Sequence, residues 1–153
     1  MVMYVWDNTV GSSRRVNATV LAYIAGFLDG DGCIKARIER SERAKFGSYI
    51  KINVSFTQHI NSKHVLVWIK NQLQVGTISD YNIPSKHLSE YVIFDGKFNE
   101  RLLKNLKRYV VNKCQELNLA LEILNLKDRS KNEESFKKAI KAALEIRRLN
   151  SSS

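Results

Sequence analysis

The sequence predicts an α+β domain with the order αββαββα, a four-stranded antiparallel sheet and additional C-terminal helices. Apolar side chains recur at helical spacing over 17–28 and 61–73, and two strand-like stretches follow each of these helices. Three further helical stretches close the chain at about 97–109, 112–127 and 132–149. With 153 residues, 44% of them hydrophobic, the chain is expected to form one domain, 1–153, with an ordered core of roughly 17–149.

The first helix is expected to begin after Asn17, an N-cap candidate, and to end in an acidic, glycine-rich stretch. Asp29 and Asp31 then lie at the helix C-terminus, where the helix dipole disfavours each carboxylate by ~0.3–1 kcal/mol. Such a stretch is most often only a C-cap and loop. A divalent cation would turn the repulsion into a binding site, because carboxylate and carbonyl oxygens are the ligands that Mg²⁺ prefers. An EF-hand is excluded, because the sixth position from Asp29 is not Gly and the twelfth is not Glu.

The same helix has a stripe of small residues at spacings of three and four: Ala22, Ala25, Gly26 and Asp29. Glycine inside a helix costs roughly 1 kcal/mol relative to alanine, so Gly26 requires a compensating interaction. Close approach of another backbone is the usual compensation. The stripe occurs once in the chain, so its expected partner is the same helix of a second copy, in a two-fold homodimer.

The strands are predicted from residues that alternate between apolar and polar. Stretches 34–39 and 49–57 alternate on either side of a polar turn at 41–47, and 76–81 and 88–94 form a second hairpin around Pro84. Asn61 is the N-cap candidate of the helix between the hairpins. Two sets of apolar residues compete for the core side of the last strand: Leu88, Val92 and Phe94, or Tyr91 and Ile93.

The net charge of +10 indicates a polyanionic partner, with nucleic acid favoured over an anionic membrane surface or simple solubility. Basic residues are concentrated in 33–70, with eight against two acidic residues, and in 96–113, with six against one. One face of the sheet is expected to be exposed and to offer side chains for phosphates and base edges. The candidate DNA-binding residues are Lys35, Arg37, Glu39, Arg40, Tyr49, Lys51, Asn53, Ser55, Ser79 and Tyr81.

Cysteine content and hydropathy limit the cellular context. Cys33 and Cys114 are too few for a disulfide framework, which favours an intracellular, reduced protein whose compartment stays open. No apolar run is long enough to cross a membrane, and no secretory segment is evident. We therefore expect no membrane partner.

The nine residues Ile24–Gly32, IAGFLDGDG, closely resemble the LAGLIDADG motif of homing endonucleases, and the resemblance extends from about Asn17 to Lys127. It implies a saddle-shaped sheet in the major groove of double-stranded DNA and a homodimer with one motif per copy. It also implies a double-strand break in a long pseudo-palindromic target, by phosphodiester hydrolysis that depends on Mg²⁺. Mn²⁺ or Ca²⁺ is expected to fit the same site.

Within this resemblance, Asp31 matches the catalytic second acid of the motif and is the expected metal ligand, together with the main-chain carbonyl of Gly30. Asp29 matches the first acid, which is expected to support the helix end. An intron-RNA maturase or a non-cleaving DNA-binding protein on the same scaffold is the alternative function. The intact Asp31 favours the enzyme, because a pure binder gains nothing from a carboxylate that faces phosphate.

The remaining catalytic candidates are Gln58, Lys63 and Lys113. Gln58 matches a polar residue that positions the attacking water, and Lys113 resembles a basic residue that faces the scissile phosphate. Relatives often have another basic residue four positions after this Gln, where the present chain has Ser62 followed by Lys63. Either Lys63 reaches the same phosphate or that role is weakened.

Overall fold

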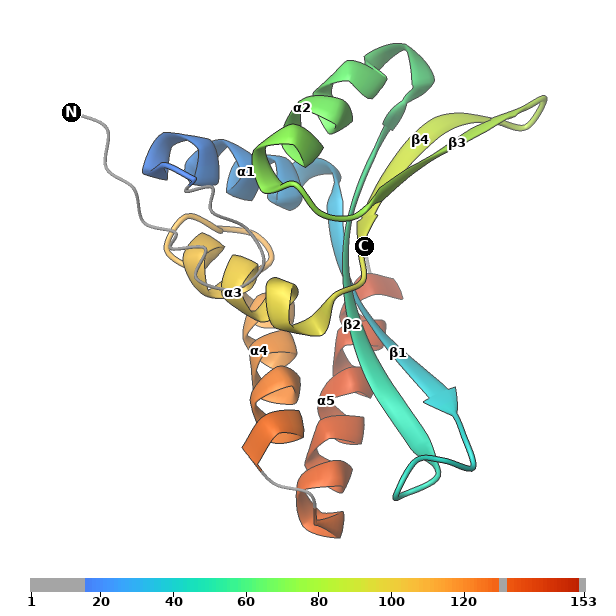
Figure 1. The fold of residues 1–153 in the computed structure, drawn as a ribbon, viewed down its shortest axis with the longest axis vertical. Helices are drawn as coiled ribbons and strands as arrows, with labels where there is room; N and C mark the ends of the chain where they lie inside the picture. The colour runs from blue at the N-terminus through green and yellow to red at the C-terminus, as the bar shows by residue number, and fades with distance from the viewer. Residues whose placement is uncertain (1–15, 130–131, 152–153) are drawn as a thin grey trace.

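The computed structural model describes residues 16–129 and 132–151 and confirms the predicted order of elements (Figure 1). The sequence also predicts frayed ends over the first ten or so residues and over 151–153. Ser151 is instead the last residue of a helix, and the other residues of both ends lie outside the described part. The elements are α1 (Ala18–Asp31), β1 (Gly32–Arg40), β2 (Ser48–His59), a 3₁₀ turn η1 (Ile60–Ser62), α2 (Lys63–Leu73), β3 (Thr77–Ile83), β4 (Lys86–Ile93), α3 (Gly96–Leu106), α4 (Cys114–Arg129) and α5 (Glu133–Ser151).

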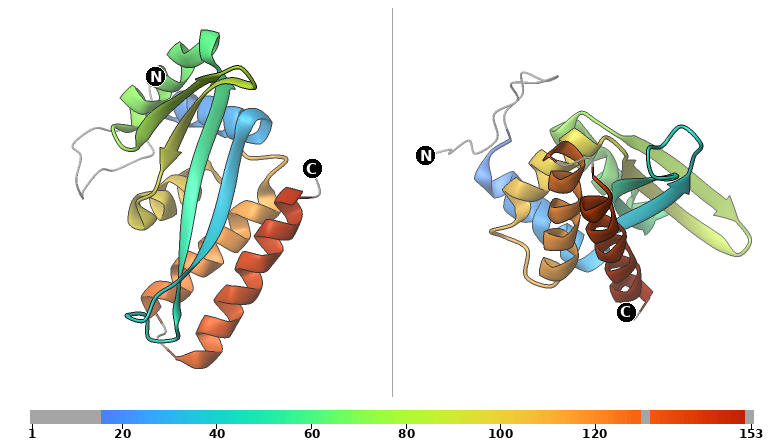
Figure 2. Two further views of the ribbon diagram at one scale, coloured as in Figure 1. Left: turned by 90° about the vertical axis from the view of Figure 1, so that its right-hand side faces the viewer. Right: turned by 90° about the horizontal axis from the view of Figure 1, so that it is seen from below.

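The four strands form one antiparallel sheet in the order β1-β2-β4-β3. The two hairpins diverge from the centre of the sheet, which gives the sheet the predicted curvature (Figure 1). The helices pack behind the sheet, and its other face is uncovered (Figure 2, left). We call the uncovered face the outer face. No helix in the described ranges is long and apolar enough to cross a membrane.

Both ends of α1 have local causes in the sequence. The Asn17 side chain accepts a hydrogen bond from Val20 N at 2.9 Å, so the predicted N-cap is confirmed. At the other end a Cβ on Gly32 would lie 2.7 Å from Leu28 Cα and 2.6 Å from its Cδ1. A glycine is therefore needed where the chain passes directly from the helix into β1.

The predicted N-cap at Asn61 is wrong. A 3₁₀ turn over 60–62 precedes α2, and its cap is His59, whose Nδ1 accepts from the backbone N–H of Asn61 at 3.1 Å. Ser62 precedes α2 and makes no capping hydrogen bond with its side chain. The sequence showed a helical pattern but not that its first turn is tighter than an α-helix.

The ambiguous phase of the last strand is resolved in favour of Tyr91 and Ile93, which are fully buried. The Tyr91 hydroxyl donates to the carbonyl of Val75 at 2.5 Å, and its ring stacks with Phe56. Phe94 lies beyond the strand and is 53% exposed. Burial of the large aromatic ring, with a partner for its hydroxyl, decides which set faces the core.

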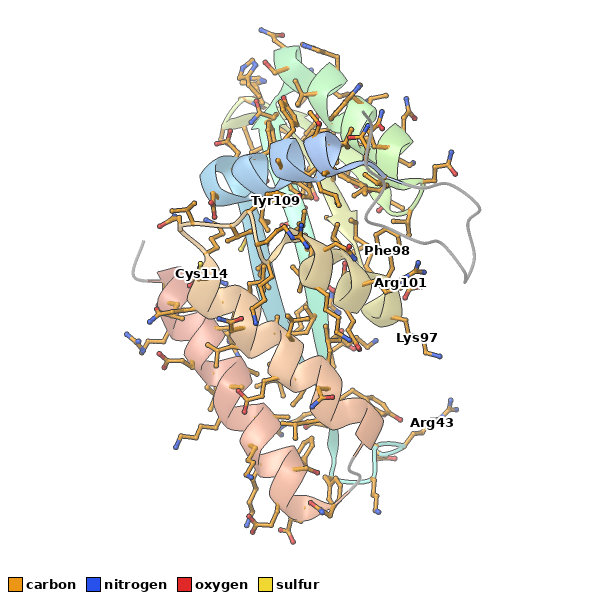
Figure 3. All side chains as sticks on the ribbon, turned by 90° about the vertical axis from the view of Figure 1, so that its left-hand side faces the viewer. Arg43, Lys97, Phe98, Arg101, Tyr109 and Cys114 are labelled. Atoms are coloured by element: carbon orange, nitrogen blue, oxygen red, sulfur yellow. The ribbon has the colours of Figure 1, made fainter. Side chains whose placement is uncertain are left out.

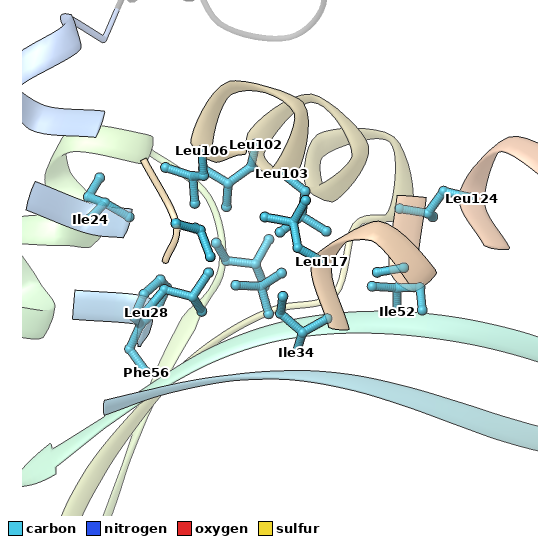
Figure 4. Close-up of a cluster of buried hydrophobic side chains, with 14 of the residues drawn as sticks. Ile24, Leu28, Ile34, Ile52, Phe56, Leu102, Leu103, Leu106, Leu117 and Leu124 are labelled. Atoms are coloured by element: carbon cyan, nitrogen blue, oxygen red, sulfur yellow. The ribbon is translucent and has the colours of Figure 1, made fainter. Parts of the chain in front are cut away.

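The core lies between the sheet and all five helices, and Figure 4 shows part of it, with residues such as Leu28, Ile52 and Leu102. The side chain of Asn99 is a polar group that enters this core. The Asn99 amide, on α3, donates to the carbonyls of Ile52 and Ile93 at 2.9 Å each. This buried amide ties α3 to β2 and β4 where the two hairpins meet.

Candidate active site and nucleic-acid interface

The C-terminal end of α1 brings together three of the four predicted catalytic residues. Gln58 Nε2, near the end of β2, donates to Asp31 Oδ2 at 2.8 Å and also to the carbonyl of Thr57 at 3.0 Å. Asp31 is exposed, and no ion pair of its carboxylate occurs in the described part of the chain. It is therefore a charged group held by a neutral amide and open to solvent.

Asp29 has a different environment from Asp31. Its two carboxylate oxygens accept hydrogen bonds from the backbone N–H groups of Val111 and Lys113, at 2.8 and 3.0 Å. These donors lie in the segment that leads into α4, next to the positive end of that helix's dipole. The carboxylate of Asp29 was expected to be unfavourable at the C-terminus of α1, but the N-terminal end of another helix of the same chain compensates for it. This contact agrees with the expected role of Asp29 in supporting the helix end.

Lys113 reaches the same end of α1. Its Nζ donates to the main-chain carbonyl of Asp29 at 3.3 Å, and Asn112 Nδ2 lies 3.5 Å from that oxygen. A lysine ammonium has three N–H donors, so two remain for other acceptors. Lys113 is half-buried, which limits the motion of its side chain.

Lys63 has a partner that the sequence analysis did not identify. It begins α2, and its Nζ donates to Asp80 Oδ2 of β3 at 2.8 Å. Ser62, which stands where relatives often have a basic residue, lies in the 3₁₀ turn just before Lys63. Because Ser79 and Tyr81 were expected on the exposed face, the alternation sets Asp80 on the opposite side of β3, but no local pattern links it to Lys63, 17 positions earlier.

The donor set at the end of α1 fits a divalent cation only in part. Asp31 supplies one exposed carboxylate, and Gly30 is exposed beside it, so its carbonyl is the second oxygen expected to bind. No group of three or more His, Cys, Asp or Glu side chains able to hold a metal occurs among the described residues. Further oxygen ligands must come from outside one copy of the chain.

The predicted stripe of small residues on α1, which included Ala25 and Asp29, needs two corrections. Asp29 is half-buried, and its carboxylate is bound by backbone N–H groups of its own chain, so it does not belong to an exposed row. Ala25 is fully buried in the core of its own chain, while Ala22 and Gly26 are exposed. Gly30 extends this exposed row by one turn, and a Cβ at Gly26 or Gly30 would meet no atom within 4 Å. The exposed small row is therefore Ala22, Gly26 and Gly30, because one turn of a helix moves the row by four residues rather than three.

Most predicted DNA-binding residues share the outer face. The strand register pairs Lys35 with Asn53, Arg37 with Lys51 and Glu39 with Tyr49, while Ser79 and Tyr81 follow on β3. Glu39 forms ion pairs with Arg37 and with Lys51, the latter at 3.0 Å, and Lys35 Nζ lies 4.0 Å from Glu90. The basic side chains of this face are thus partly neutralised by acidic neighbours.

Three residues of the predicted set differ from the expectation of an exposed face. Asn53 and Ser55 are 5% and 3% exposed, because they lie on the central strand β2 between longer side chains of its neighbours. Arg40 follows the alternation of Ile38 and therefore falls on the opposite face, at the end of β1. The register also adds Glu90 and Lys86 to the outer face, where Lys86 Nζ lies 4.4 Å from the Tyr81 ring.

Part of the second basic segment, 96–113, lies on the helical side of the molecule (Figure 3), whereas Lys113 lies beside the end of α1. Lys97 and Arg101 project from α3 on the helical side, as Figure 3 shows. Their helix buries its apolar side against the core and leaves its charged side outward. The basic residues of the two segments are therefore not gathered on one face: Arg37 and Lys51 lie on the outer face, and Lys97 and Arg101 lie on the helical side (Figure 3).

A family model described as LAGLIDADG endonuclease matches residues 24–119. The chain is 28% identical over 112 residues to DNA endonuclease I-CreI of Chlamydomonas reinhardtii, which covers 73% of this chain and 66% of I-CreI. It is 29% identical over 113 residues to DNA endonuclease I-CvuI of Chlorella vulgaris, covering 71% and 68% of the two chains. The match thus spans about two thirds of the length of these relatives.

Solved structures show the same fold. I-CvuI in complex with its target, in the presence of calcium, superposes with a TM-score of 0.72 and 25% identity over 82% of this chain and 78% of I-CvuI. A further I-CvuI complex holds the I-CreI target, not cleaved, in the presence of magnesium. The homing endonuclease I-TnaI has a TM-score of 0.73 at 19% identity, over 82% of this chain and 86% of I-TnaI.

Proposed function

This chain belongs to the LAGLIDADG endonuclease family, and we propose that it is a homing endonuclease that makes a site-specific double-strand break in DNA. The observation that carries the proposal is the exposed carboxylate of Asp31, held by Gln58 Nε2 at 2.8 Å. Lys113 lies close by, bound to the carbonyl of Asp29 in the last turn of the same helix. A carboxylate, an amide and an ammonium at one point fit phosphodiester hydrolysis.

The cation we propose is Mg²⁺, with the Asp31 carboxylate and the Gly30 carbonyl as ligands from each copy of the chain. Mg²⁺ in nucleic-acid enzymes is commonly bound by one or two carboxylates together with phosphate oxygens and water, which matches this small donor set. When bound, the cation supplies neutralisation of the phosphate charge and activation of the attacking water. Mn²⁺ or Ca²⁺ would find the same hard oxygen ligands.

The side chains around Asp31 divide the remaining tasks. Gln58 orients the Asp31 carboxylate through its amide N–H, and its amide oxygen is available to accept from the attacking water. Lys113 donates one N–H to the Asp29 carbonyl, and this hydrogen bond orients its ammonium group. Two N–H donors remain for a phosphate. The backbone grip of Asp29 keeps α1 and the start of α4 together while DNA binds.

The assembly we propose is a two-fold homodimer joined along the exposed row of α1. Gly26 costs roughly 1 kcal/mol within the helix relative to alanine, yet nothing in its own chain lies within 4 Å of the place of a Cβ. Close contact with a second helix along this row would explain why a glycine stands at position 26. The dimer would also bring two Asp31 carboxylates together, which one chain does not provide.

The outer face of each sheet would lie in the major groove of double-stranded DNA. Arg37 and Lys51 can contact guanine edges or phosphates, and Tyr49, Ser79 and Tyr81 add neutral hydrogen-bonding groups. I-CvuI, which shares the fold, is bound to its target DNA, which supports this placement.

Purified protein incubated with Mg²⁺ and a library of randomised duplex DNA tests the function. We expect selective cleavage of one sequence class, lost on chelation and in Asp31→Asn, while Asp31→Asn still binds that class. Specific DNA binding without cleavage, in Mg²⁺ or Mn²⁺, would overturn the enzyme and leave a DNA-binding protein. Preferential binding of structured RNA over the selected DNA would favour the maturase instead.

A further inference from the structure

Lys63, Asp80 and Ser89 form a connected group at the end of the sheet nearest Asp31. Lys63 Nζ donates to Asp80 Oδ2 at 2.8 Å, and Ser89 Oγ donates to Asp80 Oδ1 at 2.7 Å. The three residues come from α2, β3 and β4. Each oxygen of the Asp80 carboxylate therefore has its own donor.

The Asp80 carboxylate is held by Ser89 on the side that faces the protein and is exposed to solvent on its opposite side. Ser89 is fully buried, so its hydroxyl is a rigid anchor for Asp80. The side chains of Lys63 and Asp80 are each 41% exposed, which leaves the ammonium accessible from solvent. The hydrogen bonds from Lys63 and Ser89 hold the pKa of Asp80 below its usual value, so the carboxylate stays charged at neutral pH.

The strand register places this group in line with the candidate active site. Gln58 on β2 pairs with Ser89 on β4, and Ser89 pairs with Asp80 on β3. Directly paired residues project to the same face, and neighbouring strands lie about 4.8 Å apart, so Asp80 is about 10 Å from Gln58 across the sheet. Gln58 is the residue that donates to Asp31.

We propose that Asp80, anchored by Ser89, is a positioning residue that aims the ammonium of Lys63 at a phosphate of the DNA strand held at Asp31. The inference rests on the proposed endonuclease function. A free lysine side chain has many rotamers, and one charge-assisted hydrogen bond restricts them while leaving two N–H donors for the phosphate. An acidic residue at this point would otherwise repel DNA, and its pairing with Lys63 removes that cost.

The main test measures single-turnover cleavage and DNA affinity separately in Asp80→Asn and Lys63→Met. Asn keeps the size of Asp80 and an acceptor for Ser89 but loses the charge. We expect Asp80→Asn to cut about tenfold more slowly, less than the ~100-fold that an ångström of misplacement can cost. Its DNA affinity should be unchanged or tighter, because a negative charge has been removed. The double variant should cut no more slowly than Lys63→Met alone.

The matched control is Glu100→Gln on α3, which breaks an ion pair of the same 2.8 Å length with Lys104 away from the sheet end. It should cut like the wild type, and the thermal unfolding midpoints of all variants should agree, since Asp80 is a surface residue. Wild-type cleavage by Asp80→Asn, or rate losses that multiply in the double variant, would overturn the positioning role alone. Absence of any cleavage by the wild-type protein would instead overturn the proposed function.

Discussion

Asp29 and Asp31 lie two residues apart in α1, yet only Asp31 keeps its carboxylate open to solvent. Asp29 has a structural role, because each of its carboxylate oxygens accepts a hydrogen bond from a backbone N–H group, that of Val111 or that of Lys113. Asp31 accepts one hydrogen bond from Gln58 and lies at the negative end of the helix dipole. The two acids of the motif are therefore expected to respond in opposite ways to substitution.

Asp31→Asn should lower the Mg²⁺-dependent cleavage rate by about 100-fold or more, since even loss of a residue that only supports a metal ligand costs 10–100-fold. DNA affinity should hold or rise, because a charge that repels phosphate is removed. Folding stability should also hold, since the substitution removes a carboxylate from a helix C-terminus. Paired binding and cleavage assays on the selected duplex check this, and near-normal cutting would refute the role of Asp31.

Asp29→Ala provides the contrast to Asp31→Asn. It leaves the N–H groups of Val111 and Lys113 without their acceptor, a loss that costs about 1–3 kcal/mol where the donors are not solvated. We expect a lower free energy of unfolding in denaturant titrations. An Asp29→Ala protein as stable as the wild type would show that this contact does not support the helix end.

Helix α1 has two packing faces, one in the core of its own chain and one that the chain leaves open. Leu21, Ile24, Ala25 and Leu28 are fully buried, whereas the row Ala22, Gly26 and Gly30 is exposed. The glycines of the motif accordingly differ in purpose. Gly32 is required by contact with Leu28 in the same chain, and Gly26 is not required by any contact within 4 Å.

Gly26→Leu should therefore separate the proposed dimer without unfolding the subunit. The place of its Cβ is open, and replacing a helical glycine with leucine is expected to stabilise the isolated helix by about 0.5–1 kcal/mol. Sedimentation should show a monomer with an unfolding midpoint no lower than that of the wild type, and double-strand cleavage should be lost. Gly32→Ala should instead lower the midpoint. A Gly26→Leu dimer that persists at micromolar concentration would contradict the proposed interface.

The whole assembly predicts the length and symmetry of the DNA site. Strand β2 has twelve residues and spans about 40 Å at roughly 3.3 Å per residue. Two copies end to end span up to ~80 Å, so allowing for the curvature of the sheet we expect a pseudo-palindromic site of about 20 base pairs at ~3.4 Å each. Nuclease footprinting measures this directly, and protection of ten base pairs or fewer would rule out a dimeric saddle on DNA.

Much of this molecule follows from local patterns in the sequence. Alternation predicted the first hairpin, helical spacing predicted the helices, and Asn17 predicted the start of α1. The roles of Asp31, Gln58 and Lys113 came from resemblance to a family. Gln58 is 27 positions from Asp31 and Lys113 is 84 positions from Asp29, so no local pattern indicates these contacts. Local patterns did not decide which side of the strand that contains Tyr91 faces the core, because both sides carry apolar residues. They also did not predict the 3₁₀ turn before α2.

The sequence by itself determined the order of helices and strands, the first hairpin and the acidic end of α1, because each depends on residues a few positions apart. Only the tertiary structure decided which charges face which partner. In the folded chain Asp29 binds backbone N–H groups in the segment that leads into α4, whereas Asp31 stays exposed. Lys63 pairs with Asp80. Asn53 and Ser55 are buried in the centre of the outer face. These outcomes depend on strand order and helix packing, which bring distant residues into contact, and no spacing along the chain encodes them.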